Sequence, residues 1–158
     1  MTETGKRPDR RTLSSAARLY AVQALFQMEA AGQSADRVTR EFQNFRIAAD
    51  DRDGPTAEAD EALFGRIVDD VVIWQSRIDQ ATDRALVERW PIERIDPVLR
   101  AVFRAAGAEL VTGRAPAKVV ISEYVRLTQA FFPEGRETKF VNAVLDHMAR
   151  HLQPDAFS

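Results

Sequence analysis

The sequence contains no cysteine. Disulfides, iron–sulfur ligation, thiolate nucleophiles and zinc sites with cysteine ligands are therefore excluded. Seven glycines and seven prolines in 158 residues are too few for a fibrous or low-complexity chain. No run approaches the roughly 18 consecutive apolar residues of a membrane span, so we expect none. The lack of cysteine also suits a reducing compartment, and we expect a cytoplasmic protein.

Helical spacing dominates the hydrophobic pattern, and no segment alternates with period two long enough to predict a strand. At 45% hydrophobic and 29% charged residues, the composition is typical of one globular domain. The sequence predicts an all-α fold, a compact bundle of about seven helices. A mobile basic arm over residues 1–11 precedes a single helical domain over 12–158. The charged, Gly-Pro-containing stretch at 49–57 divides this domain into sub-bundles at about 12–57 and 58–158.

Several helix ends are marked by capping residues. Ser14 or Ser15 is expected to begin the first helix, Ser34 the second, and Asp96-Pro97 a later one, while Gly32 and Gly113 end helices. A long helix is expected from about Glu58, with a bend before Trp90-Pro91. Its hydrophobic period predicts that Trp74 faces inward, and that Asp69, Asp70 and Asp79 face water or a partner.

Lysine is scarce, since only Lys6, Lys118 and Lys139 are lysines among 22 cationic residues. The overall charge of -2 gives no sign of a nucleic-acid partner, but the charged residues are distributed unevenly along the chain. Residues 1–20 have five cationic and two acidic side chains, whereas residues 50–96 have six cationic and thirteen acidic ones. The positive charge is therefore concentrated at the start of the chain and the negative charge in its middle.

Motifs for catalysis and cofactor binding are missing. There is no glycine-rich phosphate loop, no Gly-x-Ser-x-Gly elbow and no histidine beside a recognisable nucleophile. His147 and His151 have the four-residue spacing of metal ligands, but two ligands do not make a site. We expect a protein that is not an enzyme and that needs no metal or cofactor.

The basic N-terminal segment fits single-stranded RNA. Lys6-Arg7-Pro8-Asp9-Arg10-Arg11 is followed by Arg18, Tyr20 and Phe26. Arginines neutralise RNA phosphates, while aromatic and guanidinium planes stack on unpaired bases. A solvated tail and core packing of Phe26 are the alternatives.

Three blocks of this sequence resemble the NusB family of transcription antitermination proteins. The first comprises Arg10-Arg11, Ala17-Arg18 and Gln23-Ala24-Leu25-Phe26-Gln27. The second comprises Arg94-Ile95-Asp96-Pro97, Val102-Phe103-Arg104-Ala105-Ala106 and Glu109-Leu110. The third comprises Pro116, Lys118-Val119, Ile121, Glu123, Lys139-Phe140-Val141-Asn142 and Val144-Leu145-Asp146. Their order and spacing match over roughly residues 10–150.

The resemblance implies an all-helical fold of two small bundles without catalysis. It implies an RNA partner, the boxA element of ribosomal RNA leaders, and a protein partner, the small-subunit ribosomal protein that doubles as NusE. The pair is expected to join other Nus factors on RNA polymerase and suppress termination. Family relatives occur as monomers and as dimers, so a homodimer stays open.

Together, the basic arm and the resemblance predict one RNA path. We expect Arg10, Arg11, Arg18 and Lys139 to line it, with Phe26 and Phe140 as stacking residues whose alternative is core packing. Arg136 stands where relatives often have acidic or small residues and is expected to add phosphate attraction beside Lys139. Lys118 stays undecided between RNA and a carboxylate such as Glu123.

The acidic middle of the chain suggests a surface for the basic ribosomal protein, because complementary charge speeds encounter and fixes orientation. Asp69, Asp70 and Glu93 are the candidate residues. An ordinary solvated helix face is the alternative.

Two other functions compete with this interpretation. One is the RNA-binding module of a ribosomal RNA cytosine methyltransferase, which is disfavoured because the sequence ends at Ser158 without a cofactor domain or catalytic cysteine. The other is a helical protein–protein adaptor whose basic arm never meets RNA.

Overall fold

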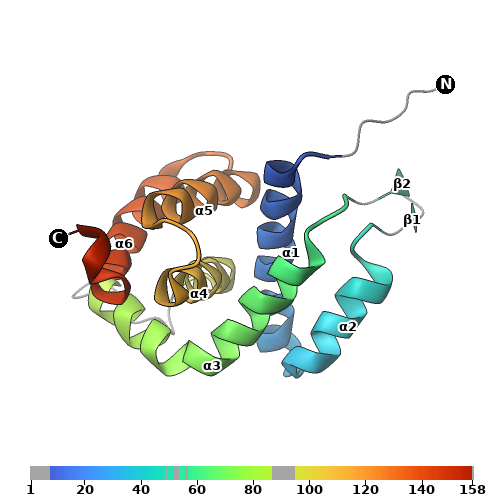
Figure 1. Ribbon diagram of the computed structural model, residues 1–158, viewed down its shortest axis with the longest axis horizontal. Coiled ribbons are helices and arrows are strands. Elements are labelled where there is room, and N and C mark those ends of the chain that lie inside the picture. Colours follow the sequence, from blue (N-terminus) through green and yellow to red (C-terminus); the bar gives the residue numbers. More distant parts are fainter. Residues whose placement is uncertain (1–7, 49, 52–53, 56, 87–94, 158) are drawn as a thin grey trace.

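A computed structural model describes residues 8–48, 50–51, 54–55, 57–86 and 95–157 of the chain (Figure 1). In these ranges it contains six α-helices, compared with the expected seven or so. They are α1 (Arg10–Ala31), α2 (Ala35–Phe45), α3 (Glu61–Leu86), α4 (Pro97–Thr112), α5 (Ala117–Phe131) and α6 (Arg136–Leu152), and a short 3-10 helix (Pro154–Phe157) follows. None of the helices in these ranges has the length and apolar character of a membrane span. The all-α prediction is confirmed.

Four of the predicted cap residues, Ser34, Asp96, Gly32 and Gly113, begin or end helices as expected. Ser34 Oγ accepts a hydrogen bond from the Arg37 amide at 3.2 Å. The Asp96 carboxylate accepts one from the Val98 amide at 2.7 Å, and Pro97 follows as the first residue of α4. Gly32 and Gly113 end α1 and α4 in the left-handed conformation that glycine adopts without strain.

Helix α1 begins earlier than predicted. Asp9 is its N-cap, with a carboxylate that accepts the Thr12 amide at 2.8 Å, and neither Ser14 nor Ser15 has this role. Arg10 and Arg11 are therefore helical residues, not part of a mobile arm. Residues 1–7 of the expected arm, and the expected bend before Trp90-Pro91, lie outside the described residues.

Helix α4 forms the centre of the structure. Ten of its sixteen residues are buried, and it packs against α1, α3, α5 and α6 (Figure 1). Helix α2 packs against α1 and α3 at the side away from α5 and α6. The charged stretch that the sequence predicts as a loop contains two short antiparallel strands, β1 (Asp50–Asp51) and β2 (Gly54–Pro55). The proposed division into two sub-bundles stays a prediction.

Three side chains of α3, those of Trp74, Asp70 and Asp79, differ from their predicted environments. Trp74 is 38% exposed and does not face inward, while Asp70 is buried and ion-paired with Arg114 at 2.8 Å. Asp79 is also paired, with Arg104 at 3.0 Å. The hydrophobic period of α3 does not predict the positions of Asp70 and Asp79, because their partners lie in later segments of the sequence.

Gly107 is a position where α4 lies close against α3 and α6. A Cβ atom at this residue would overlap Ile78 Cγ2 of α3 and lie 3.3 Å from Met148 Cε of α6. Glycine in mid-helix ordinarily weakens a helix by about 1 kcal/mol relative to alanine. Here the missing methyl group lets three helices meet.

We expect Gly107→Ala to lower the free energy of unfolding by about 1–2 kcal/mol, because overpacking outweighs the gain in helix propensity. Gly65→Ala is the matched control in α3, where a new Cβ meets no atom within 4 Å. This control should leave stability unchanged or raise it. Urea denaturation of both variants measures the difference, and equal effects would contradict the packing argument.

Candidate nucleic-acid interface

Two exposed arginines mark the start of α1. The Asp9 cap fixes the first turn of the helix, from which Arg10 and Arg11 project at the surface. The Arg11 side chain is 74% exposed, and its Nη2 atom lies a loose 3.9 Å from the Glu123 carboxylate. An ion pair at this distance and exposure contributes little to stability, so Arg11 is available to an external anion.

Helix α5 adds cations beside these arginines. Lys118, Ser122 and Arg126 are four residues apart and share one exposed side of the helix. Arg10 and Arg11 line a groove of about 600 Å³ together with Lys118 and Ser122. Lys118 and Ser122 also line a second groove, of about 520 Å³, that reaches Arg126. The two grooves are neighbours that share these two residues.

Helix α6 borders the second groove. Its Asn142 and Asp146 line the groove opposite α5. Lys139 is exposed one turn before Asn142, and Arg136 is exposed at the first residue of the helix. Asp146 is the one acidic group in this lining, and it accepts a hydrogen bond from Arg150 at 3.2 Å.

We call the surface formed by Arg10, Arg11, Lys118, Arg126 and Lys139 the cationic face. Its side chains come from three helices and are exposed. Spaced cations along a groove match the repeating phosphates of a nucleic acid strand. The neighbouring Ser122 and Asn142 offer hydrogen-bonding groups for sugars or base edges.

Arg18 lines the first groove, but unlike Arg10 and Arg11 it is a buried residue and not an exposed cation of this face. The residue is 7% exposed. Its guanidinium donates two hydrogen bonds to the Glu109 carboxylate of α4, from Nε at 2.8 Å and from Nη2 at 2.9 Å. Tyr124 of α5 donates a further hydrogen bond to Glu109 at 2.6 Å. Arg18 therefore joins α1, α4 and α5 from inside.

Glu123 connects this buried cluster with the cationic face. Its carboxylate accepts hydrogen bonds from Ser15 at 2.7 Å, from Arg126 at 2.8 Å and from Arg18 at 3.5 Å. Glu123 is 8% exposed, whereas Arg126 is half exposed. A buried carboxylate thus orients a surface arginine, which preorganises the face for an anion.

The environment of this cluster raises the pKa values of both Arg18 and Tyr124. Burial alone lowers the pKa of Arg18, but its hydrogen bonds and attraction to Glu109 outweigh this and raise that pKa above its ordinary value. Burial, reinforced by the Glu109 charge, raises the pKa of Tyr124 well above its ordinary value. Arg18 stays charged and Tyr124 stays neutral at physiological pH.

The two aromatic candidates lie apart from the cationic face. Phe26 is 39% exposed and lines a separate groove with Phe42, Val98 and Phe131. It follows Arg10 by sixteen residues, or about 24 Å along α1. The Phe140 ring packs edge-on against the buried Phe103, with centroids 6.0 Å apart. Core packing, the alternative that the sequence left open, accounts for Phe140.

The three acidic partner candidates have different positions. Asp69 is exposed on α3. Asp70 is buried and paired with Arg114, so it does not present a free charge to a partner. Glu93 lies outside the described residues. The expected acidic surface therefore has one exposed member in the described part of the chain.

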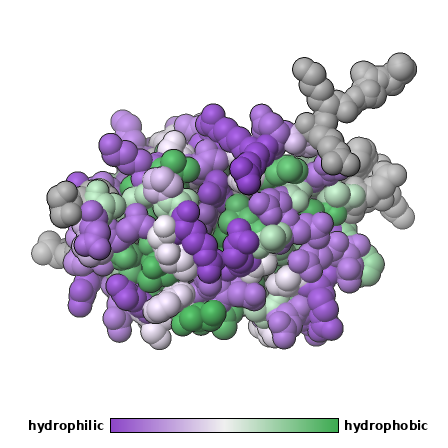
Figure 2. Space-filling model, viewed as in Figure 1, coloured by the Kyte–Doolittle hydropathy of each residue, from purple (hydrophilic) through white to green (hydrophobic). Residues whose placement is uncertain are grey.

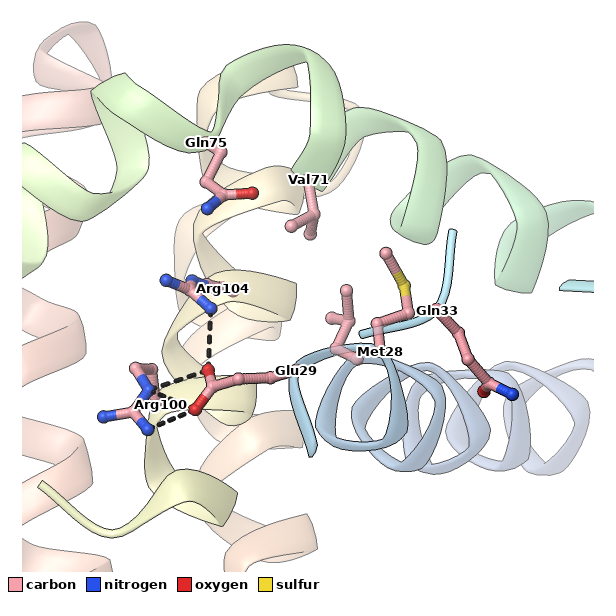
Figure 3. A pocket seen from close by; sticks show the side chains of 8 residues that line it. Met28, Glu29, Gln33, Val71, Gln75, Arg100 and Arg104 are labelled. Atoms are coloured by element: carbon pink, nitrogen blue, oxygen red, sulfur yellow. Dashed lines mark hydrogen bonds and ion pairs between the residues drawn. The ribbon is translucent and has the colours of Figure 1, made fainter. Parts of the chain in front are cut away.

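A further hollow, of about 500 Å³, lies between the end of α1, α3 and α4. Figure 3 shows Glu29 of α1 reaching Arg100 and Arg104 of α4 at its edge. The Arg100 Nε and Arg104 Nη1 atoms lie 2.8 Å and 3.0 Å from Glu29 Oε2. The hydrogen bond from Arg100 lowers the pKa of Glu29. These arginines secure α1 to α4 and do not extend the cationic face.

The two histidines of α6 have rings 4.9 Å apart. Within the described ranges, no group of three or more His, Cys, Asp or Glu side chains could hold a metal ion. The pair therefore supplies no complete metal site there.

Arg126 is the interface residue that the sequence reasoning missed. Its four-residue spacing from Ser122 and Lys118 was an available signal, since such residues share one side of a helix. The same spacing places Lys118 on the cationic face. Glu123, its expected alternative partner, instead accepts hydrogen bonds from Arg18 and Arg126.

Comparisons with known proteins agree with this architecture. The profile of the NusB family matches residues 15–150. A transcription antitermination protein NusB from Maricaulis maris (strain MCS10) is 45% identical over 150 residues, which cover 94% of this chain and 93% of that protein. The structure of T. maritima NusB has a TM-score of 0.72 at 25% identity and covers 96% of this chain and 99% of that one.

A crystal structure of antitermination factors NusB and NusE in complex with dsRNA shows the same fold. Its matching chain has a TM-score of 0.68 at 21% identity, over 87% of this chain and 96% of that chain.

The buried cluster predicts that Arg18 is required for stability. We expect Arg18→Met to lower the free energy of unfolding by about 3–5 kcal/mol, because it leaves Glu109 charged and buried without its main partner. The double variant Arg18→Met/Glu109→Met should recover more than half of this loss. Urea denaturation measures both. Unchanged stability with weakened RNA binding would instead return Arg18 to the RNA path.

Proposed function

This chain belongs to the NusB family, and we propose that it is a non-catalytic RNA-binding transcription antitermination factor. Its proposed RNA is the boxA element of ribosomal RNA leader transcripts. It binds this RNA together with NusE and, with other Nus factors, helps RNA polymerase resist termination. The observation that carries the proposal is the cationic face on α1, α5 and α6.

The charge distribution explains how a chain with a net charge of -2 binds RNA. Arg18 of α1 and Arg100 and Arg104 of α4 are neutralised by carboxylates. Arg10, Arg11 and Lys118 remain exposed beside one groove. A local excess of cations attracts phosphates within about a Debye length of 8–10 Å, whatever the sign of the total charge.

The shape of the face favours an unpaired strand. Two neighbouring grooves that share Lys118 and Ser122 would together form a track across α5. Such a track follows a flexible backbone and leaves bases free to meet Ser122, Asn142 or a protein partner. We assign Arg10, Arg11, Lys118, Arg126 and Lys139 to phosphate contacts, and Arg136 to an additional one at the start of α6.

The proposed protein partner is NusE. Support comes from the family and from the solved complex of NusB and NusE with RNA, which contains a chain of the same fold. Asp69 alone does not define where NusE docks, so the proposal does not depend on it. Transcription by bacterial-type RNA polymerase takes place in the cytoplasm, and we place this protein there.

Removal of cations from the face should weaken RNA binding and its salt dependence. Each lost phosphate contact reduces the slope of log affinity against log salt concentration by about 0.7 for a single strand. Arg10→Ala/Arg11→Ala should therefore lower the slope by about 1.4, and Lys118→Ala or Lys139→Ala by about half as much. Fluorescence anisotropy with boxA RNA, with and without NusE, measures these values.

Arg37→Ala is the matched control, since Arg37 is exposed on α2, away from the face. It should leave affinity and slope near the wild-type values. Affinity that is equal in all variants and insensitive to salt would support a protein–protein adaptor and overturn RNA binding by this face.

Charge reversal of Arg136, at the start of α6, should affect RNA affinity and stability differently. A carboxylate in the first turn of a helix interacts favourably with the helix dipole. Arg136→Asp should therefore keep or raise the melting temperature while weakening boxA binding several-fold. Equal RNA affinity in this variant and the wild type would remove Arg136 from the proposed path.

A further inference from the structure

A smaller groove follows the seam between α1 and α5 beside the cationic face. It encloses about 300 Å³, and we call it the α1–α5 pocket. Helical spacing of three or four residues places its lining on one side of each helix. The apolar part of this lining consists of Ala16 and Leu19 of α1 and Leu127 and Ala130 of α5. Leu19 and Leu127 are half-buried, so both offer apolar surface to a ligand.

Arg126 connects the pocket with the cationic face. Its side chain lines the pocket and also the second groove of the face. The Arg126 Nη2 atom donates hydrogen bonds to Glu123 Oε2 at 2.8 Å and to Ser15 Oγ at 3.1 Å. These hydrogen bonds hold the guanidinium in place while half of the side chain stays exposed. A guanidinium plane held in this way can stack on a flat ring and also attracts a phosphate.

The pocket offers what the cationic face itself does not. Phosphate contacts position a strand, whereas its unpaired bases are held by apolar or stacking surfaces and by hydrogen bonds to their edges. Of the two residues expected to stack, Phe26 lines a separate groove and Phe140 packs on the core. In the pocket, Leu19 and Leu127 supply apolar surface, and the exposed Thr12 adds a hydroxyl group that can donate or accept a hydrogen bond.

The size of the pocket fits one ring system. Small-molecule sites in proteins enclose roughly 300–1,000 Å³, and this pocket lies at the lower limit of that range. Figure 2 shows that hydrophobic surface on the viewed face is divided into small areas between hydrophilic side chains. Docking of a protein generally uses a larger contiguous apolar area. A single base is therefore a better match for the pocket than a protein segment.

We propose that the α1–α5 pocket holds one unpaired base of the bound RNA strand. The base would enter between Leu19 and Leu127, with the Arg126 guanidinium against its face. The adjoining phosphates would lie along the cationic face, at Arg11 and Lys118. The inference rests on the proposed function, because it requires the strand to bind that face. It adds a contact that depends on a base and not on charge.

Ala130→Leu tests the pocket by filling it. Ala130 is an exposed residue of α5, so the larger side chain covers the apolar lining without entering the core. We expect this variant to bind boxA RNA at least about fivefold more weakly, which is the lower end of what one well-held base contributes. The slope of log affinity against log salt concentration should stay at the wild-type value, because no phosphate contact is lost.

Ala31→Leu is the matched control for this measurement. Ala31 is also exposed, but it is the last residue of α1 and does not line the pocket. This variant should bind RNA like the wild type. Fluorescence anisotropy over a range of salt concentrations measures affinity and slope for all three proteins, and circular dichroism checks their fold.

Removal of single bases from the RNA gives the more specific test. Abasic sites are introduced one position at a time, which keeps every phosphate in place. One position should weaken binding to the wild type by at least about fivefold, yet change binding to Ala130→Leu by less than about twofold, because the pocket is already closed there. Inorganic polyphosphate, which has no bases, should bind both proteins equally and leave the methyl NMR signals of Leu19 and Leu127 unshifted.

Different results would overturn the pocket and the proposed function. If binding depends on salt but Ala130→Leu binds like the wild type, or no abasic position is coupled to this variant, the pocket holds no base and the cationic face stands. If Ala130→Leu keeps its RNA affinity but loses affinity for NusE, the pocket belongs to the protein partner. If the wild type shows no salt-dependent RNA binding at all, the proposed function itself fails.

Discussion

The buried ion pair between Arg18 and Glu109 is the interaction on which the cationic face depends. It joins α1 to α4, and the hydrogen bond from Tyr124 adds α5 to the same carboxylate. The face above is built from the first turn of α1 and the outer side of α5. If these helices moved relative to one another, Arg10 and Arg11 would no longer line a groove with Lys118. The buried ion pair therefore determines how the exposed cations of the face are arranged.

Pairing inside the molecule also determines which cations reach a ligand. Arg100 and Arg104 share Glu29 at the end of α1, and Arg114 holds Asp70. These ion pairs fix helices and neutralise their own charge. The exposed Arg10, Arg11 and Lys118 lie at the other end of α1, where Glu123 orients Arg126 without covering it. An acidic protein thereby has a local surface suited to RNA.

Local features of the sequence predicted local features of the fold. Ser34, Asp96 and Gly113 act within one turn of their own helices, so their roles follow from neighbouring residues. Arg18 could not be separated from Arg11 in this way, because its partners Glu109 and Glu123 are 91 and 105 residues distant in the sequence. Trp74 likewise matched the buried period, yet the described helices leave it 38% exposed. Burial depends on which elements meet, and spacing alone does not specify that.

Mapping of the RNA contact by NMR tests the central claim most directly. Amide and side-chain signals of the isotope-labelled protein would be followed during titration with single-stranded boxA RNA at moderate salt. Signals from the start of α1, the outer side of α5 and the start of α6 should shift together, while those of Ile73 on α3 and Phe26 on α1 should stay near their free positions. Shifts centred on α3 or on the Phe26 groove, with the first turn of α1 unaffected, would contradict the account.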